Sequence, residues 1–399
     1  MRDPGAADAE YPKPRCAGVL PAPEYGALRA RGPVRVRLPA GNHSWLLTRH
    51  KDVREGLAEP RTSADSSNPD LPRVGPLAAG PPTMSFLEMD DPEHARLRRM
   101  VTPEFTHRRV QGMRPAVENE VNGLLDALGT RTPPIDLVTE YATAVPSRVI
   151  SGLFGIPPEE REFIRATSEV LDSSTADPDE SARAFRELTD YLDRLVTDYE
   201  KNPADNVLGR LATRYVTAGE LGHDELVAMA RLLVVAGHDT TAQMIALSVL
   251  VLLRNPDQLE ALHRDPGLVR PAVDELLRYL SITQFAMVRA ATADLEIGGV
   301  PIAAGEALEF SIPAANHDDT VYARPDRLDV TRDARGHLAF GHGVHQCLGR
   351  SLASLELEVA LAGLLGRFPG LRLAVDFSGL RFRGPDSFVF GVHELPVAW

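Results

Sequence analysis

One long apolar stretch constrains the fold of this chain more than any other feature. It reads DELVAMARLLVVAGHDTTAQMIALSVLVLLRNP and spans residues 224–256. About 30 helical residues extend ~45 Å, which is the width of a whole domain. The middle of the stretch is apolar on nearly all sides, so it is expected to be buried. Polar residues interrupt any run long enough to span a bilayer, so the sequence predicts a central core helix; they are Arg231, His238, Asp239 and Gln243.

Helical periodicity also dominates much of the remaining chain. Asp91 and Pro92 resemble the N-cap and first residue of another helix. Further helices are predicted at 115–128, 137–153, 158–173, 181–200 and 268–279, and from Cys347 to about Arg367. Two short strands around a Pro-Ala-Gly-Asn turn are predicted at 34–48, and a short β region with a turn at Gly298-Gly299 at 286–302. β turns are predicted at 371–399 and a long loop at 62–90. We therefore expect one domain, residues 1–399, of the mainly α (α+β) class.

Composition narrows the possible functions. The net charge is −13 and no long run of one sign occurs, so nucleic acid is not an expected partner. The two cysteines, Cys16 and Cys347, cannot form a disulfide framework. The N-terminal residues lack the apolar core and basic region of a signal peptide, so we expect a cytoplasmic protein with no membrane contact.

The polar interruption of the long stretch is AGHDTT, residues 236–241. Gly237 costs the helix roughly 0.5–1 kcal/mol relative to alanine. Asp239 and Thr240 place polar groups where burial is unfavourable, and a threonine hydroxyl can bond to the carbonyl four residues back and distort the helix. An acid beside an alcohol in a distorted helix can carry protons. A hinge or a helix-packing contact is the alternative.

Cys347 lies in a second unusual segment, LAFGHGVHQCLGRSLASLELEVAL, at the N-terminal end of a predicted helix. The unpaired N–H groups and dipole of that helix favour a thiolate. Glycines at 341, 343 and 349 would let a flat ligand approach the backbone closely.

The residues alone allow several interpretations of this segment. Cys347 can be a buried structural cysteine, or with His342 and His345 part of a zinc site, although no fourth ligand lies nearby. A dinucleotide-binding loop is excluded because Gln346 stands where the third glycine is needed. An axial thiolate for haem iron is the remaining interpretation.

The segment FGHGVHQCLG resembles the haem-binding loop of the cytochromes P-450, F-x-x-G-x-(H/R)-x-C-x-G. Phe340, Gly343, His345, Cys347 and Gly349 fill its fixed positions. The resemblance implies the cytochrome P-450 fold, with a large helical domain, small β-sheets and the long central helix over the haem. It also implies that Cys347 ligates the iron, that Phe340 shields the sulfur, and that His345 contacts a haem propionate.

Other segments match the same family in the expected order. AGHDTT resembles its (A/G)-G-x-(D/E)-T-(T/S) pattern, which implies that Thr240 hydrogen-bonds dioxygen, that Asp239 relays protons, and that Ala236 and Gly237 line the oxygen groove. His94, Arg98 and Arg289 stand in the family's propionate-binding contexts. Glu275 and Arg278 resemble the family's structural E-x-x-R pair, for which Arg327 is the candidate third member; a solvated surface pair is the alternative.

The resemblance implies a soluble bacterial haem-thiolate monooxygenase. It would use haem b, dioxygen, and electrons from NAD(P)H through ferredoxin reductase and ferredoxin to oxidise a C–H bond or a double bond. We expect a monomer that tailors a natural product such as a polyketide, macrolide, terpenoid or peptide. A haem sensor or carrier without turnover, a zinc enzyme, or a relative that oxidises xenobiotics are the alternatives.

Two surfaces are expected to serve this activity. A basic cluster around Arg96, Arg99, Arg108 and Arg109 is either a solvated face or a docking site for an acidic ferredoxin. An apolar substrate pocket, or else ordinary core, is predicted from a set of side chains in several segments. These are Met84, Phe86, Val235, Gln284, Phe285, Met287, Val288, Phe388 and Val389, with Gln284 available to orient a polar group.

Overall fold

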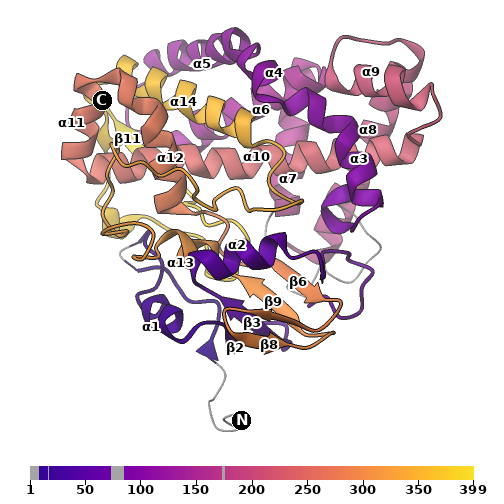
Figure 1. The fold of residues 1–399 in the computed structure, drawn as a ribbon. Coiled ribbons are helices and arrows are strands. Elements are labelled where there is room, and N and C mark those ends of the chain that lie inside the picture. The colour runs from indigo at the N-terminus through magenta and orange to yellow at the C-terminus, as the bar shows by residue number, and fades with distance from the viewer. Residues whose placement is uncertain (1–8, 17, 73–84, 173–175) are drawn as a thin grey trace.

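The structure, a computed structural model, describes residues 9–16, 18–72, 85–172 and 176–399. The helices gather in one part of the molecule and most of the strands in another (Figure 1). This arrangement confirms the predicted mainly helical fold with small sheets.

The α-helices are α1 Glu24–Arg31, α2 His50–Ala58, α3 Glu93–Val101, α4 His107–Gln111, α5 Arg114–Gly129, α6 Ala144–Phe154, α7 Arg161–Asp172, α8 Pro178–Lys201, α9 Val207–Leu211, α10 His223–Arg254, α11 Pro256–Arg264, α12 Val269–Leu280, α13 Ile312–Asn316 and α14 Arg350–Arg367. The strands are β1 Ala9–Glu10, β2 Val34–Arg37, β3 His43–Leu47, β4 Thr62–Ser63, β5 Ile135–Asp136, β6 Val288–Ala291, β7 Leu295–Ile297, β8 Val300–Ile302, β9 Ala307–Phe310, β10 Arg372–Leu373 and β11 Pro396–Ala398.

The predicted central helix is α10, which is 32 residues long and crosses the helical part of the molecule (Figure 1). At its start the Gly222 N–H donates to Glu225 Oε2 at 2.8 Å, and at its end Arg254 complements the helix dipole. Helices α6, α7, α8, α12 and α14 pack around it. By length and composition α10 could cross a membrane, yet 78% of its most apolar window is buried inside the protein, as expected for a core helix.

Most of the other predicted helices are confirmed with small shifts at their ends, but two differ. The segment predicted as one helix over 137–153 is a π-helical turn at Val138–Ala142 followed by α6. Pro146 has no N–H to donate to the carbonyl of Ala142, so a single α-helix cannot run through this point. Asp91 is not the N-cap of α3, because Pro92 occupies that position; the Asp91 carboxylate instead accepts from the Ala95 N–H at 3.1 Å.

The strands form three small sheets. The largest has the order β1-β2-β3-β9-β6-β4, with β1 parallel to β2, β3 parallel to β9 and its other neighbours antiparallel. The predicted turn between β2 and β3 is confirmed, since the Leu38 N–H donates to Asn42 O at 2.8 Å and Gly41 takes a φ of 91°. Strands β7 and β8 form the predicted hairpin at Gly298-Gly299, where φ is 60° and 82°, values that favour glycine.

The C-terminal region adds the third sheet, of order β10-β11-β5, and a hairpin. We call residues 381–393 the C-terminal hairpin. The Arg383 N–H donates to Gly391 O at 2.9 Å, and the His393 N–H donates to Arg381 O at 3.0 Å. The Val392 N–H donates to Gln243 Oε1 at 3.0 Å, which fixes the hairpin to the middle of α10.

Candidate active site

Cys347 is presented by a tight loop directly before α14. The Cys347 N–H donates to Phe340 O at 2.9 Å, which closes the loop, and α14 begins three residues later with Gly349 as its N-cap. The backbone N–H groups of Gly349 and Arg350 are directed at the sulfur. The residue is exposed, so the loop offers a cysteine to a ligand.

Gly343 shows why this loop needs glycine. Its φ is 75°, and a Cβ atom there would lie 2.3 Å from Leu57 O in α2. Any side chain at position 343 would therefore push the loop away from α2.

Two opposing influences act on the pKa of the Cys347 thiol. The N–H groups of Gly349 and Arg350 and the guanidinium of Arg98 do lower the pKa of the thiol, as expected from the helix start. Desolvation of the sulfur within the loop acts in the other direction and raises the pKa above its usual value, although the residue as a whole is exposed. A bound metal ion would favour the thiolate further.

Four basic side chains gather beside this loop. The rings of His94 and His345 lie 4.2 Å apart, and Arg98 hydrogen-bonds to Gln346 O in the cysteine loop. Burial, together with the positive charges of Arg289, His94 and Arg98, lowers the pKa of His345 to about 3. Burial also lowers the pKa of Arg289 to about 10. The acids near this cluster are Asp91, which pairs with His94, and Asp90, which acts on Arg289.

The cluster supplies a test of whether haem fits. His94 Nε2 and His345 Nδ1 are buried and have no hydrogen-bond partner among the described residues. Buried polar atoms in native proteins are nearly always satisfied, so these two atoms point to missing polar groups. The carboxylates of haem would provide negative charge and acceptors at this position; His94 Nε2 would donate to them in the imidazolium form, because its Nδ1 N–H already donates to Asp91 Oδ1. Cys347 would provide the ligand to the iron. The residues present fit haem.

The polar interruption of α10 has the expected local geometry. Thr240 Oγ1 donates to Ala236 O at 2.9 Å, four residues back, and the Ala236 residue is exposed. A Cβ atom at Gly237 would lie 2.6 Å from Ile150 Cδ1 of α6, so glycine allows α6 to pack closely here. Gly237 therefore has the helix-packing role that was the alternative interpretation, and Thr240 nevertheless has a hydroxyl group held in place by a hydrogen bond.

Asp239 is held by a residue that the sequence analysis did not identify. Arg383 of the C-terminal hairpin forms a two-point ion pair with it, with distances of 2.5 Å and 2.7 Å from the guanidinium nitrogens to Oδ2 and Oδ1. The partners are 144 residues apart, and nothing in the local pattern around Arg383 marks it.

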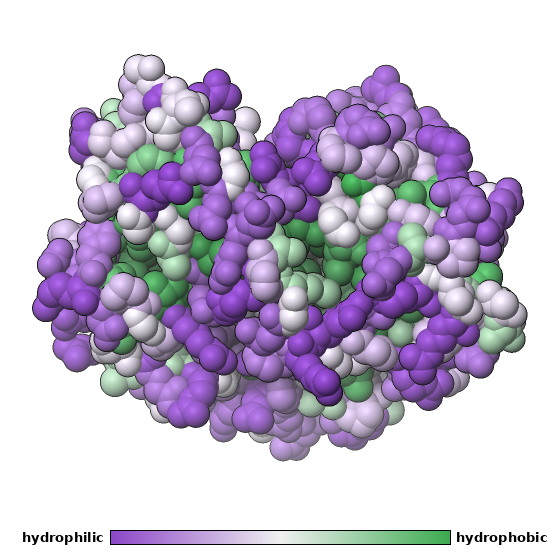
Figure 2. Space-filling model, turned by 90° about the horizontal axis from the view of Figure 1, so that it is seen from above, coloured by the Kyte–Doolittle hydropathy of each residue, from purple (hydrophilic) through white to green (hydrophobic). Residues whose placement is uncertain are grey.

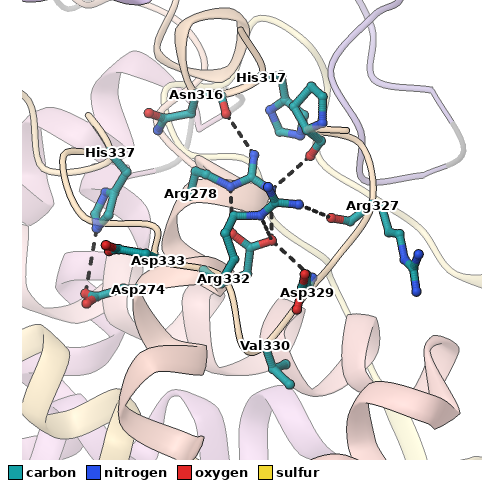
Figure 3. Close-up of polar contacts among 12 residues, drawn as sticks. Asp274, Arg278, Asn316, His317, Arg327, Asp329, Val330, Arg332, Asp333 and His337 are labelled. Atoms are coloured by element: carbon teal, nitrogen blue, oxygen red, sulfur yellow. Dashed lines mark hydrogen bonds and ion pairs between the residues drawn. The ribbon is translucent and has the colours of Figure 1, made fainter. Parts of the chain in front are cut away.

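Glu275 and Arg278 form a fully buried ion pair, which rules out the solvated surface pair (Figure 3). The prediction that Arg327 is the third member of this group is wrong. Arg332 donates to Glu275 Oε1 at 3.1 Å, whereas the side chain of Arg327 points away from the cluster in Figure 3. The physical reason is the path of the loop: Arg327 contributes its backbone carbonyl, which accepts from Arg332. Arg278 also donates to Asn316 O at the end of α13 and to Pro325 O, so the group ties α13 and the segment after it to α12.

The predicted pocket residues divide into two groups. Val235, Val288 and Val389 are buried, Phe388 is 47% exposed, and Phe86 packs beside His94 with ring centroids 6.4 Å apart. Met84 lies outside the described residues.

Three other predicted pocket residues, Gln284, Phe285 and Met287, make contacts within the protein. The Gln284 amide accepts from Arg15 and donates to Gly384 O and Ser387 O, so the expected role in orienting a ligand is wrong. Phe285 packs with Tyr11 in a separate core cluster, and Met287 packs against the cluster around Leu47. The sequence could not distinguish Gln284, Phe285 and Met287 from pocket residues such as Val288, because all four lie in one short segment.

Carboxylates pair with some arginines of the predicted basic cluster but not with all of them. Arg96 pairs with Glu93 and Glu225, and Arg109 lies 3.7 Å from Glu104. Arg99 and Arg108 are exposed and have no ion pair among the described residues. Arg108 and Arg109 line a groove of about 920 Å³ between α4, α5, α6 and α9. Figure 2 views the molecule from this side, where a mostly hydrophilic surface is hollowed and hydrophobic side chains lie deep in the hollow.

Comparison with known proteins agrees with this geometry. The family model described as Cytochrome P450 matches residues 35–266 and 267–371. The chain is 48% identical to cytochrome P450-SU2 of Streptomyces griseolus, over 95% of this chain and 94% of that one. It is 44% identical to the 20-oxo-5-O-mycaminosyltylactone 23-monooxygenase of Streptomyces fradiae, over 99% and 93% of the two chains. The crystal structure of mycinamicin VIII C21 methyl hydroxylase from Micromonospora griseorubida, bound to mycinamicin VIII, superposes with a TM-score of 0.92 at 41% identity, covering 98% of this chain and 99% of that one.

The cysteine loop, the matching fold and these relatives define a haem-dependent monooxygenase. This chain belongs to the cytochrome P450 family. It is an oxidoreductase that uses haem, dioxygen and electrons delivered by ferredoxin and its reductase, and its relatives tailor natural products. The predicted fold, enzyme class and cofactors are confirmed, and the zinc-enzyme alternative and the sensor or carrier without turnover are excluded.

Proposed function

We propose that Cys347 is the axial ligand of haem and that His94, Arg98, Arg289 and His345 bind its propionates. The observation that carries this proposal is the pair of buried, unpartnered atoms, His94 Nε2 and His345 Nδ1, beside a cysteine that two backbone N–H groups face. Phe340 and Gly349 belong to the same loop, and Ala236 and Gly237 belong to the polar part of α10. When bound, haem supplies activation of dioxygen for insertion of one oxygen atom into a C–H bond or a double bond.

The protein's own contribution is to move protons. Thr240 Oγ1 donates to a backbone carbonyl, so its oxygen lone pairs remain available to accept a proton. Asp239 precedes it in the chain and has a carboxylate held by Arg383. We assign Asp239 as the residue that receives protons from solvent and Thr240 as the hydroxyl that passes them on.

A spectrum tests the ligand assignment. Purified protein that is reduced and exposed to carbon monoxide is expected to show the red-shifted Soret band of thiolate-ligated haem. A haem-loaded preparation without that band would contradict the assignment of Cys347.

For the substrate we propose a large, moderately apolar molecule of the macrolide type. Two of the relatives are named for macrolide-type substrates, and the exposed Phe388 offers an aromatic surface on the hairpin that contacts α10. A panel of macrolide aglycones, glycosylated macrolides, steroids and small terpenes can be titrated while the iron spin state is monitored. Macrolides are expected to give the largest shift, and a larger shift with a small xenobiotic would favour the alternative within this family.

Electron delivery is proposed to occur at Arg99, Arg108 and Arg109. All three are exposed, and α4, which carries two of them, packs against α14 behind the cysteine loop. Arg96 is omitted from this site because two carboxylates already neutralise it. We further propose that the chain is a single-domain, cytoplasmic monomer, which gel filtration and fractionation can test.

A further inference from the structure

Residues 336–340 lead into the cysteine loop, and we call them the loop entrance. The last of them, Phe340, accepts from the Cys347 N–H through its carbonyl at 2.9 Å. The Leu338 N–H donates to Asn316 Oδ1 at 2.7 Å, a buried contact that joins the entrance to α13. The position of the entrance therefore determines where the closing hydrogen bond of the cysteine loop lies.

His337 acts on this entrance from within it. Its side chain is only 3% exposed, and its Nδ1 accepts from the Ala339 N–H at 3.2 Å. A backbone N–H can only donate, so Nδ1 carries no hydrogen and Nε2 must carry it. The ring of His337 also lies beside that of Phe340, with centroids 5.8 Å apart. A single side chain thus holds the backbone of the entrance and packs against its last residue.

The Nε2–H group of His337 faces an acid. Nε2 is buried and has no hydrogen-bond partner in the part of the chain that the structure describes. Asp274 Oδ1 of α12 lies 3.9 Å from it (Figure 3), a distance longer than a hydrogen bond. The Asp274 side chain is 40% exposed, so it has room to turn toward the ring. Buried donors in native proteins are nearly always satisfied, and Asp274 is the acceptor that this geometry offers, directly or through a water.

Helix α12 already reaches the loop entrance by another route. Arg278 of the buried ion pair donates to Asn316 O at 2.8 Å, and the side chain of Asn316 accepts from the Leu338 N–H. Contact between Asp274 and His337 adds a second connection from the same helix. The two connections end on adjacent residues, so together they fix both the position and the orientation of the entrance.

We propose that His337 is a positioning residue for Cys347, holding the loop entrance through Nδ1 while Asp274 accepts from its Nε2–H in the haem-loaded enzyme. The proposal rests on the role proposed above for Cys347 as the ligand of haem. A fixed entrance keeps Phe340 O on the Cys347 N–H and so keeps the sulfur in one place. When the entrance loosens, the sulfur takes up a proton from water more readily and is lost as a thiolate ligand.

The first test measures loss of thiolate ligation without turnover. The haem-loaded enzyme is reduced and exposed to carbon monoxide, and the disappearance of the red-shifted Soret band is followed with time. His337→Phe keeps a ring in the site but has neither the acceptor nor the donor, so the band should disappear about tenfold faster than in wild type. His337→Asn has a side-chain oxygen that can accept from the N–H two residues on, and it should reduce this effect to about threefold.

Asp274→Ala tests the second contact while His337 and its hydrogen bond to Ala339 stay in place. The band should disappear about threefold faster than in wild type, because the buried Nε2–H loses its charged acceptor. The matched control is Asp333→Ala, which removes a nearby exposed carboxylate that pairs with Arg335 (Figure 3). Its rate should stay within about twofold of wild type.

Denaturant unfolding of the same variants separates positioning from general destabilisation. His337→Asn and Asp274→Ala should unfold at the denaturant concentration of wild type while their bands disappear faster. The proposal would be overturned by wild-type rates in both His337→Phe and Asp274→Ala, or by rates that merely follow the unfolding midpoints. Should His337→Phe fail to fold, Asp274→Ala decides in the same way.

A crystal structure of the haem-loaded enzyme gives an independent test. It is expected to show Asp274 or an ordered water within hydrogen-bond distance of His337 Nε2, and an Nε2 that faces only carbon atoms would overturn the proposal. Each of these negative results, obtained with a wild-type enzyme that shows the red-shifted band, would leave the assignment of Cys347 intact. Absence of that band in haem-loaded wild type would instead contradict the proposed function.

Discussion

The loop around Cys347 and the polar part of α10 are built in different ways. The cysteine loop is largely self-contained, since its closing hydrogen bond joins Phe340 to Cys347 and the N–H groups that face the sulfur come from Gly349 and Arg350. The acid on α10, in contrast, depends on Arg383, 144 residues away in sequence. An arrangement of neighbouring residues, such as the cysteine loop, can be recognised from a short motif. A contact between residues far apart in the sequence, such as Asp239 with Arg383, can be recognised only in the folded chain.

The substitution Cys347→Ala gives the largest expected effect and tests the role of the cysteine loop. The variant should lose the red-shifted Soret band of the reduced carbon monoxide complex, and product formation should disappear, because no other thiol can reach the site. Cys16→Ala is the matched control, since its thiol bonds to Pro21 O elsewhere and should leave the spectrum unchanged. A normal spectrum from Cys347→Ala would contradict the ligand assignment.

Thr240→Ala tests the relay on α10. The spectrum should be retained, while product formation falls by about 10²-fold and electrons are released as hydrogen peroxide, because the hydroxyl that passes protons is gone. Peroxide and product are measured against NADPH consumed. Thr241→Ser, which changes the neighbouring hydroxyl residue conservatively, should behave like wild type; equal coupling in Thr240→Ala and wild type would refute the relay role.

Arg332→Ala compared with Arg327→Ala tests a long-range contact that local sequence did not reveal. Glu275 is fully buried, and Arg332 is one of its two cationic partners, so its loss should lower the free energy of unfolding by about 3 kcal/mol. Arg327→Ala removes an outward-pointing side chain and should change the free energy of unfolding by less than about 0.5 kcal/mol. Denaturant unfolding of the two variants decides between them, and equal destabilisation would mean that Arg327 also supports the cluster.

Charge reversal at Arg108 and Arg109 gives the smallest expected effect. Arg108→Glu and Arg109→Glu should raise the KM for ferredoxin several-fold at low salt and leave the spectrum unchanged, because exposed charges steer association and salt screens them. Arg37→Glu, at the exposed last residue of β2 in the strand-rich part of the molecule, is the control. An unchanged KM at low salt would place electron delivery elsewhere.

Sequence alone predicted the features that depend on periodicity or on short motifs. The length of α10, the hairpins at 34–48 and Gly298-Gly299, and the Thr240 hydrogen bond all follow from residues within a few positions of each other. The choice of Arg332 over Arg327 depends instead on the path of a loop. The roles of Gln284 and Phe285 were missed because burial against Arg15 and Tyr11 is decided by chain segments about 270 residues away.

The C-terminal hairpin has a practical consequence for engineering. It carries Phe388, an exposed aromatic side chain, and Arg383, which forms the ion pair with Asp239, and hydrogen bonds with Gln243 and Gln284 also hold it in place. Libraries that vary this loop to accept new compounds will therefore also alter how efficiently NADPH is used. Screens at these positions should score wasted reductant together with yield.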